Sequence, residues 1–143
     1  MSEERKVFFN GKLVPESEAK VSIYDSSLMF GDMVFEMTRS FNKNHFKLKE
    51  HIDRLFLGLK ILRIQIPYTK KEMIDICLKT ANANDHLFSK DDEHRLMIDV
   101  SRGILGIYEG VTGIKKGSNV IVADFPLRWT VSGMGKFFDT GIN

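Results

Sequence analysis

Two short segments carry side chains whose types and spacing could serve chemistry. In the first, Phe30-Gly31-Asp32 leads into an apolar run that carries Glu36 and Arg39. In the second, Arg54 follows His51 by three residues near the start of a helical pattern. A guanidinium placed there could grip a phosphate or a carboxylate, because its planar fork makes two parallel hydrogen bonds. The alternatives are an ion pair on an edge strand for the first segment and a solvated arginine for the second.

Other reactive residue types favour structural interpretations. His94 follows the acidic run 91–93, but neighbours in sequence do not all face one centre, so we expect a solvated turn and no metal site. Cys77 falls on the inner stripe of a helical pattern and is interpreted as a buried thiol. Lys136 follows the glycine-rich turn 133–135 and is interpreted as a surface lysine, since a Schiff-base lysine needs a desolvated pocket.

The composition limits the class of protein. The chain has 143 residues, 43% of them apolar, and a formal net charge of +2, which fits one domain with a buried core. That charge offers no electrostatic case for binding nucleic acid or a membrane surface. No apolar stretch reaches the roughly 20 residues that cross a bilayer. One cysteine cannot form an internal disulfide, so we expect a reducing, cytoplasmic compartment.

Hairpins are predicted in the first third of the chain. Asn10-Gly11 between the apolar runs at 7–9 and 13–14 predicts the first hairpin, because both positions tolerate positive φ. The run 21–24 is a candidate extension of that region, and residues 26–29 read as a turn or a short helical piece ending at Gly31. We expect a strand over 33–41, a turn at 42–44 and an antiparallel return over 45–47.

Two helices and two more strands follow. Apolar residues recur at helical spacing from Ile52 to Leu62, with Ile66-Pro67 closing that helix. Thr69-Lys-Lys-Glu72 is a capping box, so a second helix begins there and ends at 82–84. The runs 96–100 and 120–123 look like strands buried on both faces. This order predicts an α+β fold, with two helices on one face of a mostly antiparallel sheet.

The ordered set of motifs resembles class IV pyridoxal-phosphate (PLP) enzymes, which include branched-chain aminotransferases, D-amino-acid aminotransferases and aminodeoxychorismate lyase. It covers essentially the whole chain and matches the amino-terminal domain of these enzymes. The motifs are Phe9-Asn-Gly-Lys12, Tyr24-Asp25, Phe30-Gly-Asp32 with Val34-Phe-Glu36 and Arg39, Phe46-x-Leu48-x-x-His51-x-x-Arg54-Leu55, and Ile64-x-Ile66-Pro67.

The resemblance implies that residues 1–143 are a small α+β domain that packs against a larger carboxy-terminal domain, with PLP between them. It assigns the phosphate-binding arginine of the family to Arg54, where a dianionic phosphate needs a fixed cationic fork. It places Phe35 in an aromatic wall of the substrate pocket, with Phe30 nearby. Asp32 and Glu36 are interpreted as structural, holding the turn and the strand.

Some positions depart from the family pattern. Met33 stands where a second glycine often follows Gly-Asp. The strand end Ser101-Arg102-Gly103 matches, but Ile107 and Glu109 stand where D-amino-acid aminotransferases carry an arginine and a histidine for the substrate carboxylate. Arg95 matches loosely a strand arginine of branched-chain enzymes. Arg95 and Arg102 are therefore further candidates for substrate binding.

The Schiff-base lysine of the family lies in the carboxy-terminal domain, so the resemblance places no catalytic residue in this chain. Because the sequence stops at Thr140-Gly-Ile-Asn143, we expect a fragment that is inactive alone. The intact enzyme would transfer an amino group between an amino acid, preferably branched-chain, and a 2-oxo acid, as a homodimer. The alternatives are a lyase acting on an aminated chorismate and a non-catalytic assembly domain.

Overall fold

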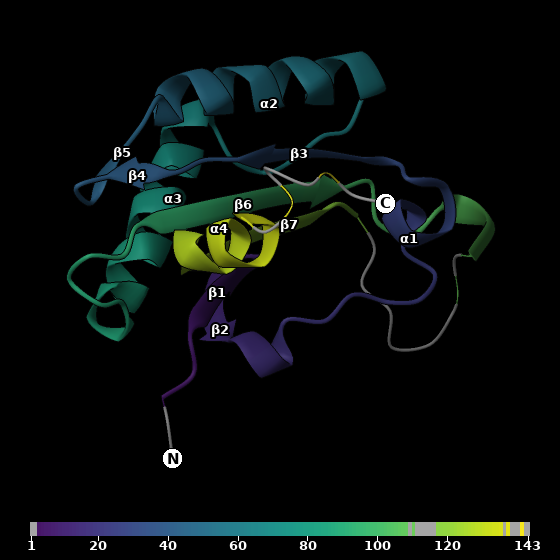
Figure 1. Ribbon diagram of the computed structural model, residues 1–143. Helices are drawn as coiled ribbons and strands as arrows, with labels where there is room; N and C mark the ends of the chain where they lie inside the picture. The colour runs from purple at the N-terminus through teal and green to yellow at the C-terminus, as the bar shows by residue number, and fades with distance from the viewer. Residues whose placement is uncertain (1–2, 109, 111–116, 136, 138–140, 142–143) are drawn as a thin grey trace.

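The computed structural model describes residues 3–108, 110, 117–135, 137 and 141, and it confirms the predicted α+β class (Figure 1). A five-stranded sheet has the order β2-β1-β7-β6-β3, and every neighbouring pair is antiparallel. A separate two-stranded ribbon joins β4 and β5. The strands are β1 (Lys6–Phe9), β2 (Lys12–Pro15), β3 (Met33–Met37), β4 (Ser40–Phe41), β5 (Asn44–His45), β6 (His94–Ser101) and β7 (Asn119–Pro126).

Helices α2 and α3 cover one face of the sheet, and α4 lies on the other side of it from α3 (Figure 1). The α-helices are α1 (Ser26–Phe30), α2 (Leu48–Leu62), α3 (Lys70–Asn84) and α4 (Leu127–Gly135). Single 3₁₀ turns occur at η1 (Glu16–Glu18), η2 (Asp85–Leu87) and η3 (Gly106–Tyr108). Within the described residues, no helix is both long and apolar enough to span a membrane.

The core lies between the sheet and its two helices. Its largest fully buried side chains come from α2, α3, β6 and β7: Ile52, Leu55, Met73, Cys77, Leu96, Ile98, Val100, Val120 and Val122. Burial raises the pKa of the Cys77 thiol to about 12, which confirms it as an inert structural residue.

The expectation that 96–100 and 120–123 are buried on both faces is wrong. Both strands alternate between buried and half-exposed residues, because helices α2 and α3 cover only one face of the sheet. The alternation is hidden in the sequence, since several residues of the open face, such as Met97, Ile121 and Ala123, are themselves apolar.

Several local predictions are confirmed. The first hairpin forms across Asn10-Gly11, and α1 ends at Gly31, whose left-handed φ of 69° closes the helix. Thr69 and Glu72 make the reciprocal capping box at the start of α3.

Other boundaries differ from the sequence analysis. The run 21–24 forms no strand. The strand predicted over 33–41 breaks after Met37, where the chain leaves β6 to form the β4–β5 ribbon. Helix α2 ends at Leu62, before Ile66-Pro67. Residues 133–135 belong to α4 rather than to a turn, and Lys136 lies outside the described residues.

A glycine brings α2 close to β3. A Cβ added at Gly58 would lie 2.8 Å from Cγ1 of Val34, so any larger residue would force the side chain of Val34, or the elements that carry the two residues, to shift. Arg54 lies about one turn earlier on α2, and Glu36 follows Val34 by two residues on the same face of β3. The contact therefore sets the distance at which Arg54 meets Glu36.

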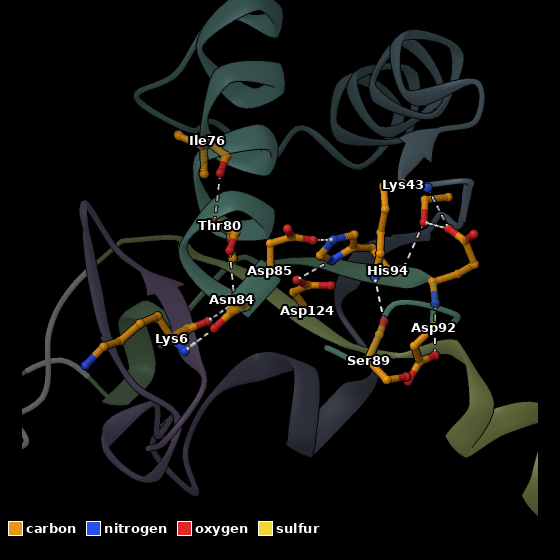
Figure 2. Close-up of polar contacts among 12 residues, drawn as sticks. Lys6, Lys43, Ile76, Thr80, Asn84, Asp85, Ser89, Asp92, His94 and Asp124 are labelled. Carbon is orange, nitrogen blue, oxygen red and sulfur yellow. Dashed lines mark hydrogen bonds and ion pairs between the residues drawn. The ribbon is translucent and has the colours of Figure 1, made fainter. Parts of the chain in front are cut away.

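Contrary to the sequence interpretation, His94 is buried rather than part of a solvated turn (Figure 2). Its Nδ1 lies 2.8 Å from Oδ2 of Asp124, its Nε2 lies 2.9 Å from Oδ1 of Asp85, and its ring stacks on Phe88. Burial alone would lower the pKa of His94, but the hydrogen bonds to the two carboxylates outweigh it and raise that pKa. The described residues hold no cluster of His, Cys, Asp or Glu suited to a metal ion.

Glu93, the last residue of the acidic run before His94, contacts the β4–β5 ribbon rather than the surroundings of His94. Glu93 accepts hydrogen bonds from the hydroxyl of Ser40 and from the backbone N–H groups of Asn42 and Lys43. It thereby closes the turn of the β4–β5 ribbon. His94 is the first residue of β6, and strand alternation turns its side chain toward η2, away from Glu93.

Replacing Gly58 with alanine should destabilise the protein. Alanine gains about 1 kcal/mol of helix propensity, but overpacking against Val34 costs about 1–3 kcal/mol, and we expect a net loss. The matched control is Gly133→Ala in α4, where nothing lies within 4 Å of the added Cβ, so only the propensity gain remains. Urea unfolding of both variants measures the difference; equal effects would contradict the close approach of α2 to β3.

His94→Leu should lower the free energy of unfolding by about 3–5 kcal/mol, because it leaves the fully buried carboxylate of Asp124 unpaired. A raised pKa means that the contribution of the charged imidazole is complete below about pH 6.5 and is lost as pH rises through the folded-state pKa. Urea unfolding should show this loss in the wild-type protein as pH rises above about 6.5, whereas in the variant the loss should instead follow ionisation of Asp124, whose pKa is raised by burial. His86→Leu is the control, since His86 pairs with Glu3 at the exposed surface.

Candidate functional site

Arg54 of α2 and Glu36 of β3 form a two-pronged ion pair. Nε of Arg54 lies 2.5 Å from Oε1 of Glu36, and Nη2 lies 2.7 Å from Oε2. The carboxylate side chain is only 5% exposed, whereas the arginine side chain is 70% exposed. The pair therefore joins a buried anion to a cation at the surface of the helix.

His51 completes this group. It lies one helical turn before Arg54, so both side chains point from the same side of α2 toward β3. Nδ1 of His51 lies 2.7 Å from Oε2 of Glu36. The hydrogen bonds from Arg54, with a smaller contribution from His51, lower the pKa of Glu36 despite its burial. Glu36 is therefore ionised at neutral pH.

The expected edge strand with an ion pair is present, since β3 lies at the edge of the sheet and Glu36 is paired, but its partner is Arg54 rather than Arg39 of the same segment. The guanidinium of Arg39 lies 3.7 Å above the ring of Phe41, and its Nε donates to the carbonyl of Ser40. The interpretation of Glu36 as structural is correct, but the role of His51 in holding it was missed. The three-residue spacing of His51 and Arg54 was the available signal.

A hollow of about 380 Å³ opens beside this ion pair. It is lined by Phe46, Lys47, Glu50, His51 and Arg54. The lining includes two cationic side chains, Lys47 and Arg54, and one carboxylate, Glu50, whose Oε1 lies 3.6 Å from Nζ of Lys47. Such a hollow suits a small anion with a polar group on one side and an aromatic ring on the other. A larger hollow of about 510 Å³, between the β1–β2 hairpin and α3, contains none of the residues predicted to bind ligand.

Phe35 points away from this ion pair. Successive strand residues face opposite sides of a sheet, so Glu36 faces α2 while Phe35 lies on the open face, 61% exposed. Its cross-strand neighbour is Asp99, whose pKa is raised by burial. Phe30 is also exposed, at the end of α1. The structure thus places Arg54 and Phe35 on two sides of β3, which is an edge strand.

Arg95 lies on the same open face as Phe35. It is half-buried on β6, and its Nη2 lies 3.7 Å from Sδ of Met37. Its Nε is buried and finds no hydrogen-bond acceptor among the described residues. A buried N–H group normally has an acceptor, so this N–H of Arg95 is left without its usual partner within the described residues.

Arg102, in contrast, forms a clamp between three segments. It bonds both oxygens of Asp32, at 2.6 and 3.2 Å, and donates to the carbonyls of Leu62 and Arg63 at the end of α2. This geometry supports the structural interpretation of Asp32. Ile107 is 78% exposed, and Glu109 lies outside the described residues.

Comparisons with known proteins identify the family of this chain. The family model for Amino-transferase class IV matches residues 33–135. A putative branched-chain-amino-acid aminotransferase of Methanocaldococcus jannaschii is 46% identical over 102 residues, which cover 71% of this chain and 34% of that protein. A D-alanine aminotransferase of Listeria monocytogenes is 32% identical over 123 residues, covering 86% of this chain and 38% of that one.

The fold recurs in solved structures. The branched-chain aminotransferase of Thermoproteus uzoniensis, solved with norvaline, superposes with a TM-score of 0.70 at 30% identity, covering 87% of this chain and 41% of that one. The chain thus spans roughly two-fifths or less of the length of these relatives. The match of the family model over most of the sequence, together with these relatives, shows that the chain belongs to the class IV aminotransferase family.

Proposed function

We propose that this chain is the amino-terminal domain of a PLP-dependent aminotransferase and that Arg54 binds the phosphate of the cofactor. The intact protein would transfer an amino group between an amino acid, with branched-chain substrates favoured, and a 2-oxo acid. The observation that carries the proposal is the guanidinium of Arg54, held on one side by Glu36 and exposed on the other.

The donor set fits the cofactor. Family members use PLP, whose phosphate is a dianion that needs fixed cationic donors. Two hydrogen bonds to Glu36 occupy two of the five N–H groups of Arg54. Nη1 has no acceptor within the described part of the chain and borders the hollow lined by Lys47 and His51. When bound, PLP supplies an electron sink for breaking bonds at the α-carbon of an amino acid.

The open face of the sheet would hold the substrate. Phe35 offers an exposed aromatic wall, Phe30 a second exposed ring, and Arg95 a buried N–H group suited to a carboxylate. Arg102 remains a candidate only if it releases Asp32 and two carbonyls, so we assign it to the clamp. Branched-chain substrates are favoured because the relative from M. jannaschii is more similar than the D-alanine aminotransferase.

We propose that the 143 residues alone do not transfer amino groups. A Schiff-base lysine needs a desolvated site, and none of the lysines that the structure describes is buried. Exposed Phe35 and the half-exposed apolar residues beside it would fit an interface in a homodimer or with further sequence of the same protein. The single buried cysteine fits a reducing compartment such as the cytoplasm.

Arg54→Ala should weaken PLP binding by about 10- to 100-fold, the loss expected for charge-assisted hydrogen bonds to a phosphate. Pyridoxal, which has no phosphate, should bind the variant as well as it binds the wild-type protein. Absorbance titration of the protein expressed from its whole reading frame measures both affinities. Lys60→Ala, which removes another exposed cation of α2, is the control. An unchanged preference for PLP over pyridoxal in Arg54→Ala would refute the assigned role.

Phe35→Ala should lower kcat/KM for branched-chain amino acids about 10-fold or more, because it removes an apolar wall of the substrate site. The free energy of unfolding should change little, since the side chain is mostly exposed. Leu57→Ala, at a similarly exposed position on α2, should leave kcat/KM unchanged. Coupled assays with L-leucine and D-alanine measure both variants; activity with D-alanine alone would overturn the branched-chain preference.

A further inference from the structure

Glu36 has the features of a residue that acts through another one. Its side chain is 5% exposed, and both of its oxygens are bound by side chains of α2. Oε1 accepts from Nε of Arg54, while Oε2 accepts from Nη2 of Arg54 and faces Nδ1 of His51. A carboxylate buried in this way has no free lone pair directed at solvent, so it is not placed to touch a ligand itself.

The two-pronged bond fixes the plane and the direction of the guanidinium. An arginine side chain that is mostly exposed would otherwise sample many rotamers and would lose that freedom on binding an anion. With Nε and one hydrogen of Nη2 directed at Glu36, the remaining N–H groups lie on the opposite edge, toward solvent. The guanidinium is therefore ordered before any anion arrives.

We propose that Glu36 is a positioning residue, which with His51 orients Arg54 so that the outer edge of its guanidinium meets the phosphate of the cofactor. This inference rests on the proposed function of Arg54. Glu36 sits on the edge strand β3, which is anchored to β6 along five residue pairs. The helix that carries Arg54 is held against the same strand at Gly58. The orienting group is therefore attached to the rigid part of the fold rather than to a loop.

Charge and orientation predict opposite effects when Glu36 is neutralised. If Glu36 acted only through its charge, then Glu36→Gln would strengthen phosphate binding, because a negative charge near the anion is removed. If it acts by orienting Arg54, then Glu36→Gln weakens phosphate binding, because the amide has only one acceptor oxygen and its NH2 group cannot accept the second of the two parallel hydrogen bonds from the guanidinium. The repulsion between Glu36 and an anion bound at the exposed edge of Arg54 is screened by solvent and salt, so the orientation effect is the larger one.

Glu36→Gln should therefore weaken the binding of PLP about 10-fold, a typical consequence of losing a charge-assisted pair, and leave the binding of pyridoxal unchanged. Equilibrium titration of the protein expressed from its whole reading frame measures both affinities without any assay of activity. The control is Asp53→Asn, which removes a charge next to Arg54 on the same helix but bonds Lys49 and Lys70 instead. Asp53→Asn should not weaken PLP binding.

Arg54→Lys provides a second variant that does not alter a buried group. Lysine keeps the charge but cannot form the two-pronged bond, so its preference for PLP over pyridoxal should fall close to that of Arg54→Ala. In the Arg54→Lys background, Glu36→Gln should no longer weaken PLP binding and should strengthen it slightly, because only the repulsive charge is left to remove. This reversal of sign separates an orienting role from a merely structural one.

The outcomes distinguish the inference from the proposed function on which it rests. If Arg54→Ala keeps the preference for PLP over pyridoxal, then Arg54 does not bind the phosphate and both statements fail. If Arg54→Ala loses that preference while Arg54→Lys and Glu36→Gln retain it, then only the positioning role of Glu36 fails. If Glu36→Gln proves too unstable to titrate, Arg54→Lys alone decides, since wild-type affinity in that variant overturns the inference.

Discussion

The buried carboxylate of Glu36 is the constraint on which the described site depends. An ionised carboxylate taken out of water is stable only when other groups replace its hydration, and here all of those groups come from α2. The lowered pKa of Glu36 shows that they do so effectively. His51 and Arg54 must therefore face β3, which fixes the rotation of α2 about its own axis. Gly58 then allows the helix to approach closely enough for these bonds to form.

The edge position of β3 would allow this one strand to serve both of the proposed binding functions. Glu36 and Val34 face α2, whereas Phe35 and Met37 face the open side of the sheet, because side chains alternate along a strand. In an interior strand, the neighbouring strands on both flanks would keep any one molecule from reaching both faces of the sheet. At an edge, a molecule that lies beyond the strand can contact the group held on one side and the aromatic ring on the other. Phosphate binding and substrate binding can then be adjacent without a loop between them.

Much of the local structure was predictable because its determinants lie within a few residues. Asn10-Gly11 specifies a tight hairpin, Thr69 and Glu72 specify a helix start, and Gly31 specifies a helix end, each through its own backbone or a near neighbour. The family resemblance also rests on such short motifs, which is why the family could be predicted from the sequence.

What could not be predicted depends on partners far away in the chain. His94 reads as part of a charged turn, because nothing nearby in the sequence shows that Asp124, thirty positions later, lies within hydrogen-bonding distance of its Nδ1. Arg39 and Arg54 were both possible partners of Glu36, and only the packing of α2 on β3 selects between them. The one-sided burial of β6 and β7 was likewise hidden, because apolar residues occur on both faces of these strands.

The three arginines differ in how many of their N–H groups are hydrogen-bonded within the fold. This number distinguishes a structural arginine from one that could bind a ligand. Arg102 makes four hydrogen bonds within the fold, to Asp32 and to the carbonyls at the end of α2, so little of it is left for a ligand. Arg54 makes two and leaves its outer edge free, while Arg95 keeps a buried Nε without an acceptor among the described residues. A structural arginine uses most of its N–H groups for hydrogen bonds within the fold. An arginine that binds a ligand is oriented by some of its N–H groups and keeps the others for the ligand. By that criterion Arg54 and Arg95 fit the anion-binding roles proposed for them on the two sides of β3, and Arg102 holds the strand, the turn and the helix together.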